Sequence, residues 1–194
     1  MSLDMSGFFG GLIPQVLEEA GAEPGNIIAE SDPYGYLAGS NGPPAGNLVL
    51  RRMQSQGGLS TALNMFVATA GAVLAGVFAV AVDLNGILLA STADRAADAA
   101  LTAAPALWSP PWQVPVQLPP GDLYAGLLVV SATTMPLFKT GSQGLGTAVN
   151  LGTSAAARNI RCASAGSGLA ALPAFPLSPA AYTSLSFNPW VALT

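Results

Sequence analysis

The sequence predicts an all-β protein: an antiparallel β-sandwich of jelly-roll-like form, preceded by an extended arm with one short helix. Its 22 glycines and 16 prolines in 194 residues favour turns. They argue against a helical bundle, where each interior proline costs about 3 kcal/mol. The apolar run Val77–Ser91 is interrupted by Asn85-Gly86, the pair that most readily supplies the positive φ angles of a tight hairpin turn. A second turn signal, Pro119–Asp122, precedes the apolar run Leu123–Val130, which has strand length and strand composition.

The chain is long enough to bury a full core in one domain. Only 8% of its residues are charged, against about 25% in an ordinary soluble domain. A monomer with so few charges would expose much uncharged and apolar surface. We therefore expect other protein chains or a membrane to cover part of it.

The charges are unevenly distributed along the chain. Residues 1–50 carry six acidic and no basic side chains, whereas the remainder carries six basic and four acidic ones. This polarity suits an acidic arm that docks on a neighbouring subunit or on another protein, although a solvated acidic segment is an equal alternative. Six dispersed basic residues do not make a nucleic-acid footprint, so no nucleic-acid partner is expected. The acidic residues of the first fifty are Asp4, Glu18, Glu19, Glu23, Glu30 and Asp32.

Residues 1–47 are predicted to form the arm, which we call the acidic arm, and residues 48–194 the sandwich domain. The first eleven residues have neither the basic nor the apolar region of a secretory signal. Leu12–Gly21 predicts a short helix, with Pro14 in its first turn and Gly21 at its end. Its apolar stripe is too small to fold alone, and the following segment is extended. The arm residues expected to contact a partner are Ile13, Val16, Leu17, Tyr34 and Tyr36.

In the domain, Gln54–Gly58 is expected to separate two strands, and Pro119–Asp122 to form a turn. Leu107–Leu118 is expected at a sheet edge, because its prolines cannot donate to a ladder. The predicted strands are Leu48–Met53, Leu59–Thr69, the Val77–Ser91 hairpin, Leu123–Ser131, a brief pairing at Pro136–Lys139 and an inner strand at Arg158–Ala163.

Three segments of the domain carry few regular elements in the prediction. The alanine-rich stretch Ala93–Ala106 is expected to be a loop with at most one or two helical turns, and Thr140–Ala157 a loop. The proline-rich tail from Leu172 to Thr194 is expected to be extended, with its aromatic side chains buried. Those side chains are Phe175, Phe187 and Trp190.

Catalytic and metal chemistry find little support in the sequence. The chain has no histidine and one cysteine, Cys162, which is expected to be a buried structural thiol. Asp94 and Asp98 are spaced four residues apart, but the polar residues that would complete a catalytic or metal site do not accompany them. The segment Gly141–Gly146 lacks the context of a phosphate loop. No enzyme activity, cofactor or metal is therefore predicted.

A transmembrane helix is an alternative for residues 63–82. They form a twenty-residue stretch without charges, and Arg51 and Arg52 precede it. Against a span, the stretch contains Asn64, Thr69 and two glycines and runs into the predicted hairpin. Membrane insertion is therefore the less favoured interpretation.

Four segments together resemble a β-sandwich domain of structural proteins from tailed bacteriophages that infect actinobacteria. They are Asn64–Gly71, Gly76–Asp94, Val116–Val129, and the closing pattern Leu177–Ala181 with Phe187–Leu193. The resemblance implies an antiparallel sandwich of the kind found in minor tail proteins and in head-decoration or fibre proteins. The acidic arm lies outside the match, and it is the part expected to anchor the domain.

The resemblance and the charge pattern together predict a virion structural protein, in the first place a minor tail protein, assembled in the host cytoplasm. Its expected partners are other virion proteins and further copies of itself. A capsid decoration or head fibre protein is the alternative within the same class. A glycan-binding adhesion module is an alternative of another class, in which a host cell-surface glycan would stack on aromatic side chains. The candidates for that stacking are Trp108, Trp112, Tyr124 and Trp190, although Trp108 and Trp112 are expected in the first place to be core-capping aromatic residues.

Overall fold

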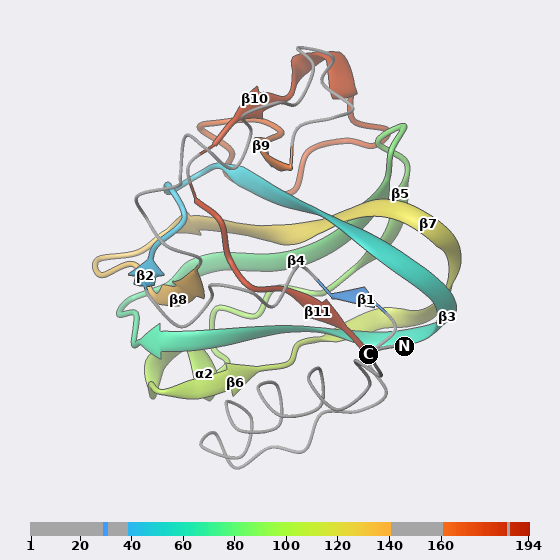
Figure 1. Ribbon diagram of the computed structural model, residues 1–194. Coiled ribbons are helices and arrows are strands. Elements are labelled where there is room, and N and C mark those ends of the chain that lie inside the picture. The colour runs from blue at the N-terminus through green and yellow to red at the C-terminus, as the bar shows by residue number, and fades with distance from the viewer. Residues whose placement is uncertain (1–28, 31–38, 141–160, 186) are drawn as a thin grey trace, which may run out of the picture.

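The computed structural model describes residues 29–30, 39–140, 161–185 and 187–194, and it confirms the all-β prediction. Every strand pairing among these residues is antiparallel, and the strands form one sheet that folds over on itself as a sandwich (Figure 1). The two helical pieces in these described ranges are the single turn α2 (Ala99–Thr102) and the 3-10 turn η4 (Pro179–Ala181). The strands are β1 (Ala29–Glu30), β2 (Gly39–Asn41), β3 (Leu48–Thr69), β4 (Ala75–Asp83), β5 (Leu88–Ser91), β6 (Ala106–Trp108), β7 (Pro111–Ser131), β8 (Leu137–Thr140), β9 (Cys162–Ser164), β10 (Thr183–Ser184) and β11 (Ala192–Leu193).

Two long strands, β3 and β7, form the spine of the domain. They pair from Leu48 opposite Leu128 to Ala62 opposite Pro111. The predicted break at Gln54–Gly58 and the predicted turn at Pro119–Asp122 are therefore both wrong.

The register of β3 and β7 explains why both turn signals failed to end a strand. Gln54 lies opposite Asp122 and Gly58 opposite Leu118, so the two signals face each other across the ladder. Gly57, Gly58 and Gly121 all have positive φ angles, which glycine adopts without steric cost. They bend both strands together, and Figure 1 shows β3 and β7 turning back side by side.

The bend brings the second half of β3 beneath the first, and two short strands close the gap. β1 pairs with β3 at Gln54 and Ser55 and with β11 on its other side. β11 in turn pairs with β3 at Leu63 and Asn64. The sheet therefore returns to β3 through β1 and β11, which closes one end of the sandwich.

The main core lies between the two layers of the folded sheet. The first half of β3 contributes Val49 and Met53 to it, and β7 and β4 contribute the alternate residues of their inner faces. The opposite layer is the second half of β3 with β6, β8 and β11, and α2 closes its margin. The large side chains of this core include Leu63, Met65, Trp108, Trp112, Leu127, Phe138 and Phe187.

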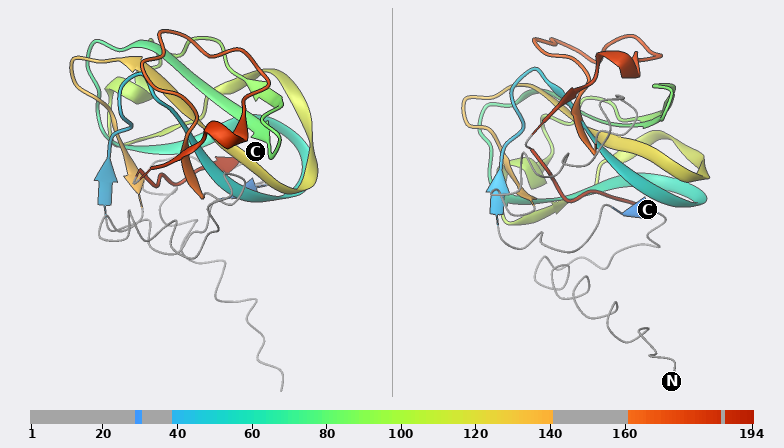
Figure 2. Two further views of the ribbon diagram at one scale, coloured as in Figure 1. Left: turned by 90° about the horizontal axis from the view of Figure 1, so that it is seen from above. Right: turned by 45° about the horizontal axis from the view of Figure 1, so that its top comes forward.

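The outer face of the β3–β7–β4 layer is also buried, because the segment from Ala165 to Tyr182 lies over it (Figure 2). Leu48 and Leu50 point to this side, as alternation along a strand requires. Leu177 and Tyr182 of the covering segment pack on them, and the Tyr182 ring meets that of Tyr124 edge to face at 5.7 Å. The sheet therefore has apolar residues on both faces.

The hairpin predicted within Val77–Ser91 is confirmed as β4 and β5. The Asp83 Oδ1 atom accepts hydrogen bonds from the backbone N–H groups of Asn85 and Ile87, each at 2.8 Å. Gly86 has a φ of +82°. Its carbonyl oxygen accepts a hydrogen bond from the Leu177 N–H at 2.9 Å, so the hairpin tip holds the covering segment in place.

The predicted loop with one or two helical turns after β5 is confirmed, since α2 is a single turn. Beyond the end of β5, side chains of this loop accept hydrogen bonds from backbone N–H groups of β4. Thr92 Oγ1 accepts a hydrogen bond from the Ala79 N–H at 3.0 Å, and Asp94 Oδ1 accepts one from the Val77 N–H at 2.8 Å.

Several smaller predictions have clear outcomes. β8 confirms the brief pairing at Pro136–Lys139. Residues 111–120 of β7 pair on one side only among the described strands, as an edge segment should. Of the tail aromatics, Phe187 is buried, but Phe175 and Trp190 are half-buried, so the prediction of burial is wrong for these two.

Other predictions fall wholly or partly outside the described residues. These are the arm helix at Leu12–Gly21, the loop at 141–157 and the first three residues of the Arg158–Ala163 strand. Residues 63–82 belong to β3, the connection after it and β4. In the described part of the chain, no helix is long and apolar enough to cross a membrane.

Replacing Gly86 with Ala should destabilise the domain strongly. A Cβ atom there would lie 2.1 Å from the Leu177 carbonyl oxygen, in addition to the strain of a positive φ. Gly168 is a matched control, because its φ is +66° and nothing lies within 4 Å of its Cβ position. We expect the unfolding free energy of Gly86→Ala to fall by at least about 2 kcal/mol more than that of Gly168→Ala. Equal losses in urea denaturation would contradict the hairpin contact.

The free energy of unfolding should fall in strong base because of Tyr182. Burial raises the pKa of its hydroxyl to about 12, because the phenolate is poorly solvated there. Between about pH 10 and pH 12 the unfolded chain loses this proton while the folded protein keeps it. Tyr182 therefore lowers stability in that window, by at most about 1.4 kcal/mol per pH unit.

The Tyr182→Phe variant should lose that part of the pH dependence. The Tyr182 Oη atom is buried without a hydrogen-bond partner among the described residues. Its removal should therefore raise the free energy of unfolding at pH 7, by about 1 kcal/mol. Urea unfolding at pH 7 and at pH 11 measures both effects. A loss of more than about 1 kcal/mol at pH 7 would show that the hydroxyl is bonded after all.

Candidate functional site

The arm residues predicted to contact a partner lie outside the described residues. This holds for Ile13, Val16, Leu17, Tyr34 and Tyr36. The described parts of the acidic arm are residues 29–30 and 39–47, and their strands, β1 and β2, both pair with strands of the domain. β2 pairs with β8, from Gly39 opposite Thr140 to Asn41 opposite Phe138.

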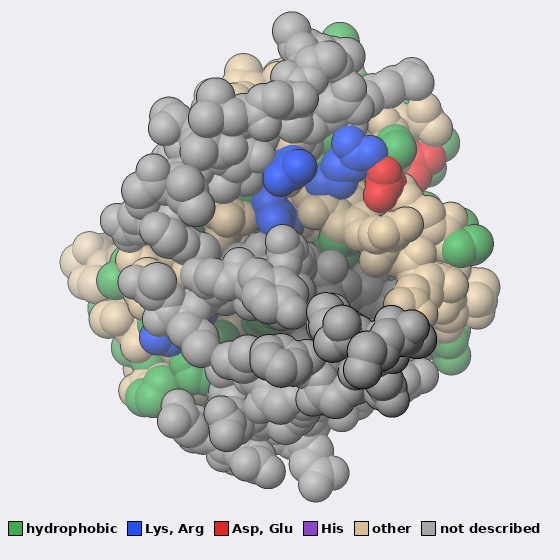
Figure 3. Space-filling model, in the orientation of Figure 1, with side chains coloured by type: hydrophobic (Ala, Val, Ile, Leu, Met, Phe, Trp, Pro, Cys, Tyr) green, Lys and Arg blue, Asp and Glu red, His purple; other side chains and the backbone are tan. Residues whose placement is uncertain are grey.

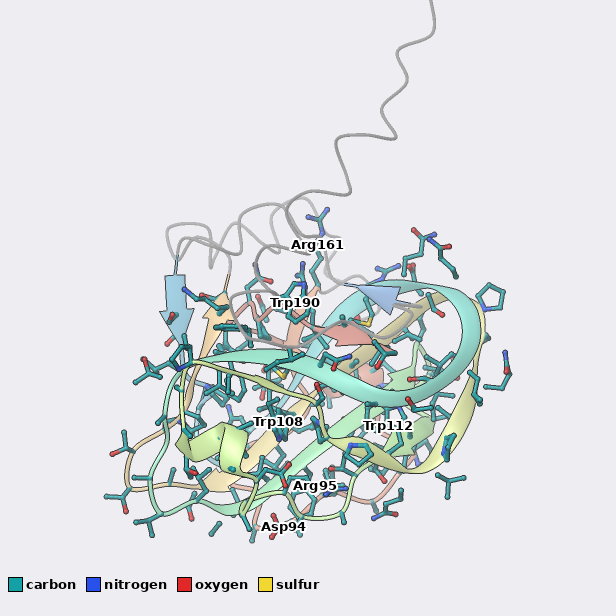
Figure 4. The ribbon with its side chains drawn as sticks, turned by 90° about the horizontal axis from the view of Figure 1, so that it is seen from below. Asp94, Arg95, Trp108, Trp112, Arg161 and Trp190 are labelled. Atoms are coloured by element: carbon teal, nitrogen blue, oxygen red, sulfur yellow. The ribbon has the colours of Figure 1, made fainter. Side chains whose placement is uncertain are left out.

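The tryptophans predicted as core residues or sugar platforms are largely internal (Figure 4). Trp108 and Trp112 are buried, and their indole N–H groups are engaged inside the domain. Trp108 Nε1 donates to Asp98 Oδ2 at 2.9 Å, and Trp112 Nε1 donates to Ser60 Oγ at 2.8 Å. Neither ring offers a face for a sugar, and Tyr124 is fully buried as well. Trp190 is half-buried, and it is the member of this set that keeps an accessible surface.

The most distinctive polar feature of the described residues is a group of arginines where β9 meets β3. Arg51 and Arg52 lie on β3, and Arg161 directly precedes β9. The backbone N–H of Arg52 donates to the Arg161 carbonyl oxygen at 2.8 Å, which places the two residues opposite each other. We call Arg51, Arg52 and Arg161 the arginine cluster, and Figure 3 shows basic side chains gathered together on this side of the molecule.

Within the cluster, Arg51 points inward. It is 7% exposed, and its Nη1 atom lies 3.1 Å from the Cys162 Sγ atom in the adjacent strand. The thiol donates in turn to Asn188 Oδ1 at 3.4 Å. Burial raises the pKa of the Cys162 thiol, an effect that the positive charges of Arg51 and Arg161 oppose. The predicted structural role of Cys162 fits this position, because a buried neutral thiol is a poor nucleophile.

Arg52 and Arg161 lie on the other face of the ladder and reach solvent. Arg52 forms an ion pair with Asp122 of β7, and both side chains are partly exposed, at 26% and 35%. Arg161 is exposed, and Figure 4 shows it projecting from the body of the domain. Burial raises the pKa of the neighbouring Tyr124 hydroxyl, so this side chain is neutral at pH 7 and cannot offset the positive charge.

The cluster is suited to binding carboxylates. Guanidinium groups stay charged at every physiological pH and present paired N–H donors that match a carboxylate. No described group of three or more Cys, Asp or Glu side chains is arranged to hold a metal ion.

Sequence reasoning did not find this cluster. Its two parts lie about 110 positions apart, and only the pairing of β3 with β9 brings them together. The available signal was that four of the six basic residues occur in two short segments, at Arg51, Arg52, Arg158 and Arg161.

Other described charges of the domain have local structural roles. Asp94 receives hydrogen bonds from the backbone N–H groups of Val77 and Ala96, and Asp83 caps the hairpin turn. Arg95 Nη2 donates to the Pro111 carbonyl oxygen at 3.4 Å. These groups stabilise loops and do not converge on a common point.

Comparison with protein-family models, with curated proteins and with solved structures finds no significant match to this chain.

Proposed function

We propose that this protein is a structural subunit of a bacteriophage virion, in the first place a minor tail protein that assembles through its acidic arm and its sandwich surfaces. The observation that carries the proposal is the separation of charge on a charge-poor β domain. The acidic arm holds six carboxylates and no basic group, whereas the domain gathers arginines on one side. The resemblance of the strand segments to phage structural domains supports the same assignment.

The low charge of the chain also supports a role in a large assembly. Each Å2 of apolar area buried between subunits stabilises the assembly by about 25 cal/mol. Such burial replaces the solubility that surface charges give a free monomer. The domain exposes isolated large apolar side chains at its loops and edges, and these are available for such contacts. They are Leu59, Val73, Ile87 and Val114, each more than half exposed.

Capsid decoration is the alternative location within this proposal. It uses the same chemistry, with the acidic arm on the shell and the sandwich outward. A glycan-binding role is less well supported, because the rings of Trp108, Trp112 and Tyr124 are buried.

The location can be tested by labelling the protein in native particles purified without detergent. Thr194 is a poor label position, because its carbonyl oxygen accepts hydrogen bonds from the Thr61 and Ala62 N–H groups. Val114, which is 72% exposed, can instead be replaced by cysteine and coupled to a maleimide gold cluster. The unsubstituted protein is the control, since its cysteine, Cys162, is fully buried.

Electron microscopy should show the Val114→Cys label on the tail. Label arrayed over the shell would contradict the tail assignment and identify a decoration protein. Absence of the protein from purified particles would contradict a virion role altogether. An Ile87→Cys variant provides a second exposed label position, in case Val114 is covered by a neighbouring subunit and does not react.

A further inference from the structure

We infer that residues 170–182 form a strap that opens separately from the rest of the domain and uncovers an apolar face of the sheet. The strap is the later part of the segment that lies over the β3–β7–β4 layer (Figure 2). In the closed state it occupies this face itself, as an intramolecular cover. The inference does not depend on the proposed function.

Both ends of the strap are fixed to the sheet. Just before it, the Leu169 N–H donates a hydrogen bond to the Gly46 carbonyl oxygen at 2.8 Å. Just after it, β10 pairs with β9, and β9 pairs with β3. The strap is therefore a loop closed at its base, like an Ω-loop. It can leave the sheet without breaking either anchor.

Between these anchors, backbone hydrogen bonding to the sheet is sparse. The bond from the Leu177 N–H to the Gly86 carbonyl oxygen, at 2.9 Å, is the one backbone hydrogen bond from the strap to another part of the described chain. Pro173, Pro176 and Pro179 have no N–H group to donate. Opening of the strap therefore breaks little of the hydrogen bonding that holds the domain together.

Apolar packing supplies most of what keeps the strap closed. Leu177 and Tyr182 are 8% and 6% exposed, and Leu172 and Phe175 pack beside them as half-buried side chains. The strap contains no charged residue, so ion pairs add nothing to this packing. Closure thus depends on the burial of a few apolar side chains, which must outweigh the conformational entropy that the strap regains on opening.

The hydroxyl group of Tyr182 opposes closure. Its Oη atom is buried without a hydrogen-bond partner among the described residues. A buried polar group that is left unpaired costs free energy. Water would satisfy this hydroxyl in the open state, so opening removes that cost.

Opening exposes a sheet face that the strap now hides. Val82 of β4 lies opposite Tyr124 of β7, and both side chains are 0% exposed. The Tyr182 ring lies edge to face on the ring of Tyr124. The inner face of the same layer stays covered, because strands of the sheet itself lie over it. The strap therefore controls whether the outer apolar face is accessible.

Thiol labelling of the full chain measures the opening. A cysteine in place of Val82 lies under the strap, whereas a cysteine in place of Val49 lies in the main core of the same layer, and both valines are 0% exposed. Site-resolved mass spectrometry after treatment with iodoacetamide separates each position from Cys162. We expect Val82→Cys to be labelled at least about tenfold faster than Val49→Cys. Urea should accelerate its labelling less, because strap opening exposes less surface than global unfolding.

Amide hydrogen exchange in the unsubstituted protein shows which segment opens. The Leu177 N–H reports on the strap. The Asp83 N–H, which donates to the Ile87 carbonyl oxygen at 3.0 Å, reports on fraying of the hairpin. The opening equilibrium constant of the Leu177 amide should agree within about threefold with that from labelling of Val82→Cys, and the Asp83 amide should be protected at least about tenfold more strongly.

Two further substitutions separate strap opening from global unfolding. Tyr182→Phe removes the unpaired hydroxyl and should slow the labelling of Val82→Cys about fivefold. Gly121→Ala is the control, because Gly121 lies at the bend of β7 with a φ of +116° and nothing within 4 Å of its Cβ position. Its backbone strain should speed the labelling of Val49→Cys and leave that of Val82→Cys unchanged. Circular dichroism checks that each variant remains folded.

Three results would overturn the inference. Equal labelling rates with equal urea dependence in Val82→Cys and Val49→Cys would show that the strap opens only when the whole domain unfolds. An Asp83 amide that exchanges as readily as the Leu177 amide would make the hairpin, and not the strap, the unit that opens. Labelling of Val82→Cys that Gly121→Ala accelerates as much as that of Val49→Cys would show that both positions react through global unfolding.

Discussion

The long ladder between β3 and β7, which has one register shift between Ser60 and Ala62, is the interaction on which the rest of the fold depends. β3 also supports β1, β6, β8, β9 and β11 along its length, and β7 supports β4. Because β3 bends at Gly57 and Gly58, it contributes to both layers of the sandwich. The other strands are between two and nine residues long, and they are positioned by the strand that they pair with.

The elements whose structure is determined by residues close together in the sequence could be predicted. The hairpin follows from Asn85-Gly86, whose positive φ angle and whose Asp83 cap are set within a few residues. The buried tryptophans and the single helical turn at Ala99–Thr102 also follow from composition and local patterns.

The failures have one physical origin, which is pairing between distant residues. Gly57-Gly58 and Pro119–Asp122 both read as turn signals when each is considered alone, and only their register across the ladder turns them into a shared bend. The arginine cluster was not predicted for the same reason, because Arg52 and Arg161 are brought together only by the pairing of β3 with β9. Phe175 and Trp190 remain half-buried because the tail covers the domain from outside.

The architecture separates the parts that hold the fold from the candidate functional site. Ionisable groups inside the domain are neutral or engaged: the hydroxyls of Tyr124 and Tyr182 and the Cys162 thiol all have raised pKa values because they are buried. Two of the basic side chains that reach solvent in the described residues, those of Arg52 and Arg161, lie where β9 joins β3.

The most direct test of the β3–β7 ladder as the organising element is native-state hydrogen exchange, measured residue by residue by NMR. If the bent strand is one cooperative unit, the slowest amides of residues 48–56 and of residues 62–67 will exchange with the same free energy, equal to that of global unfolding. If the predicted break were real, the two halves would open separately, and the second half would exchange at a lower free energy. That result would contradict the account of a single bent strand shared by both layers.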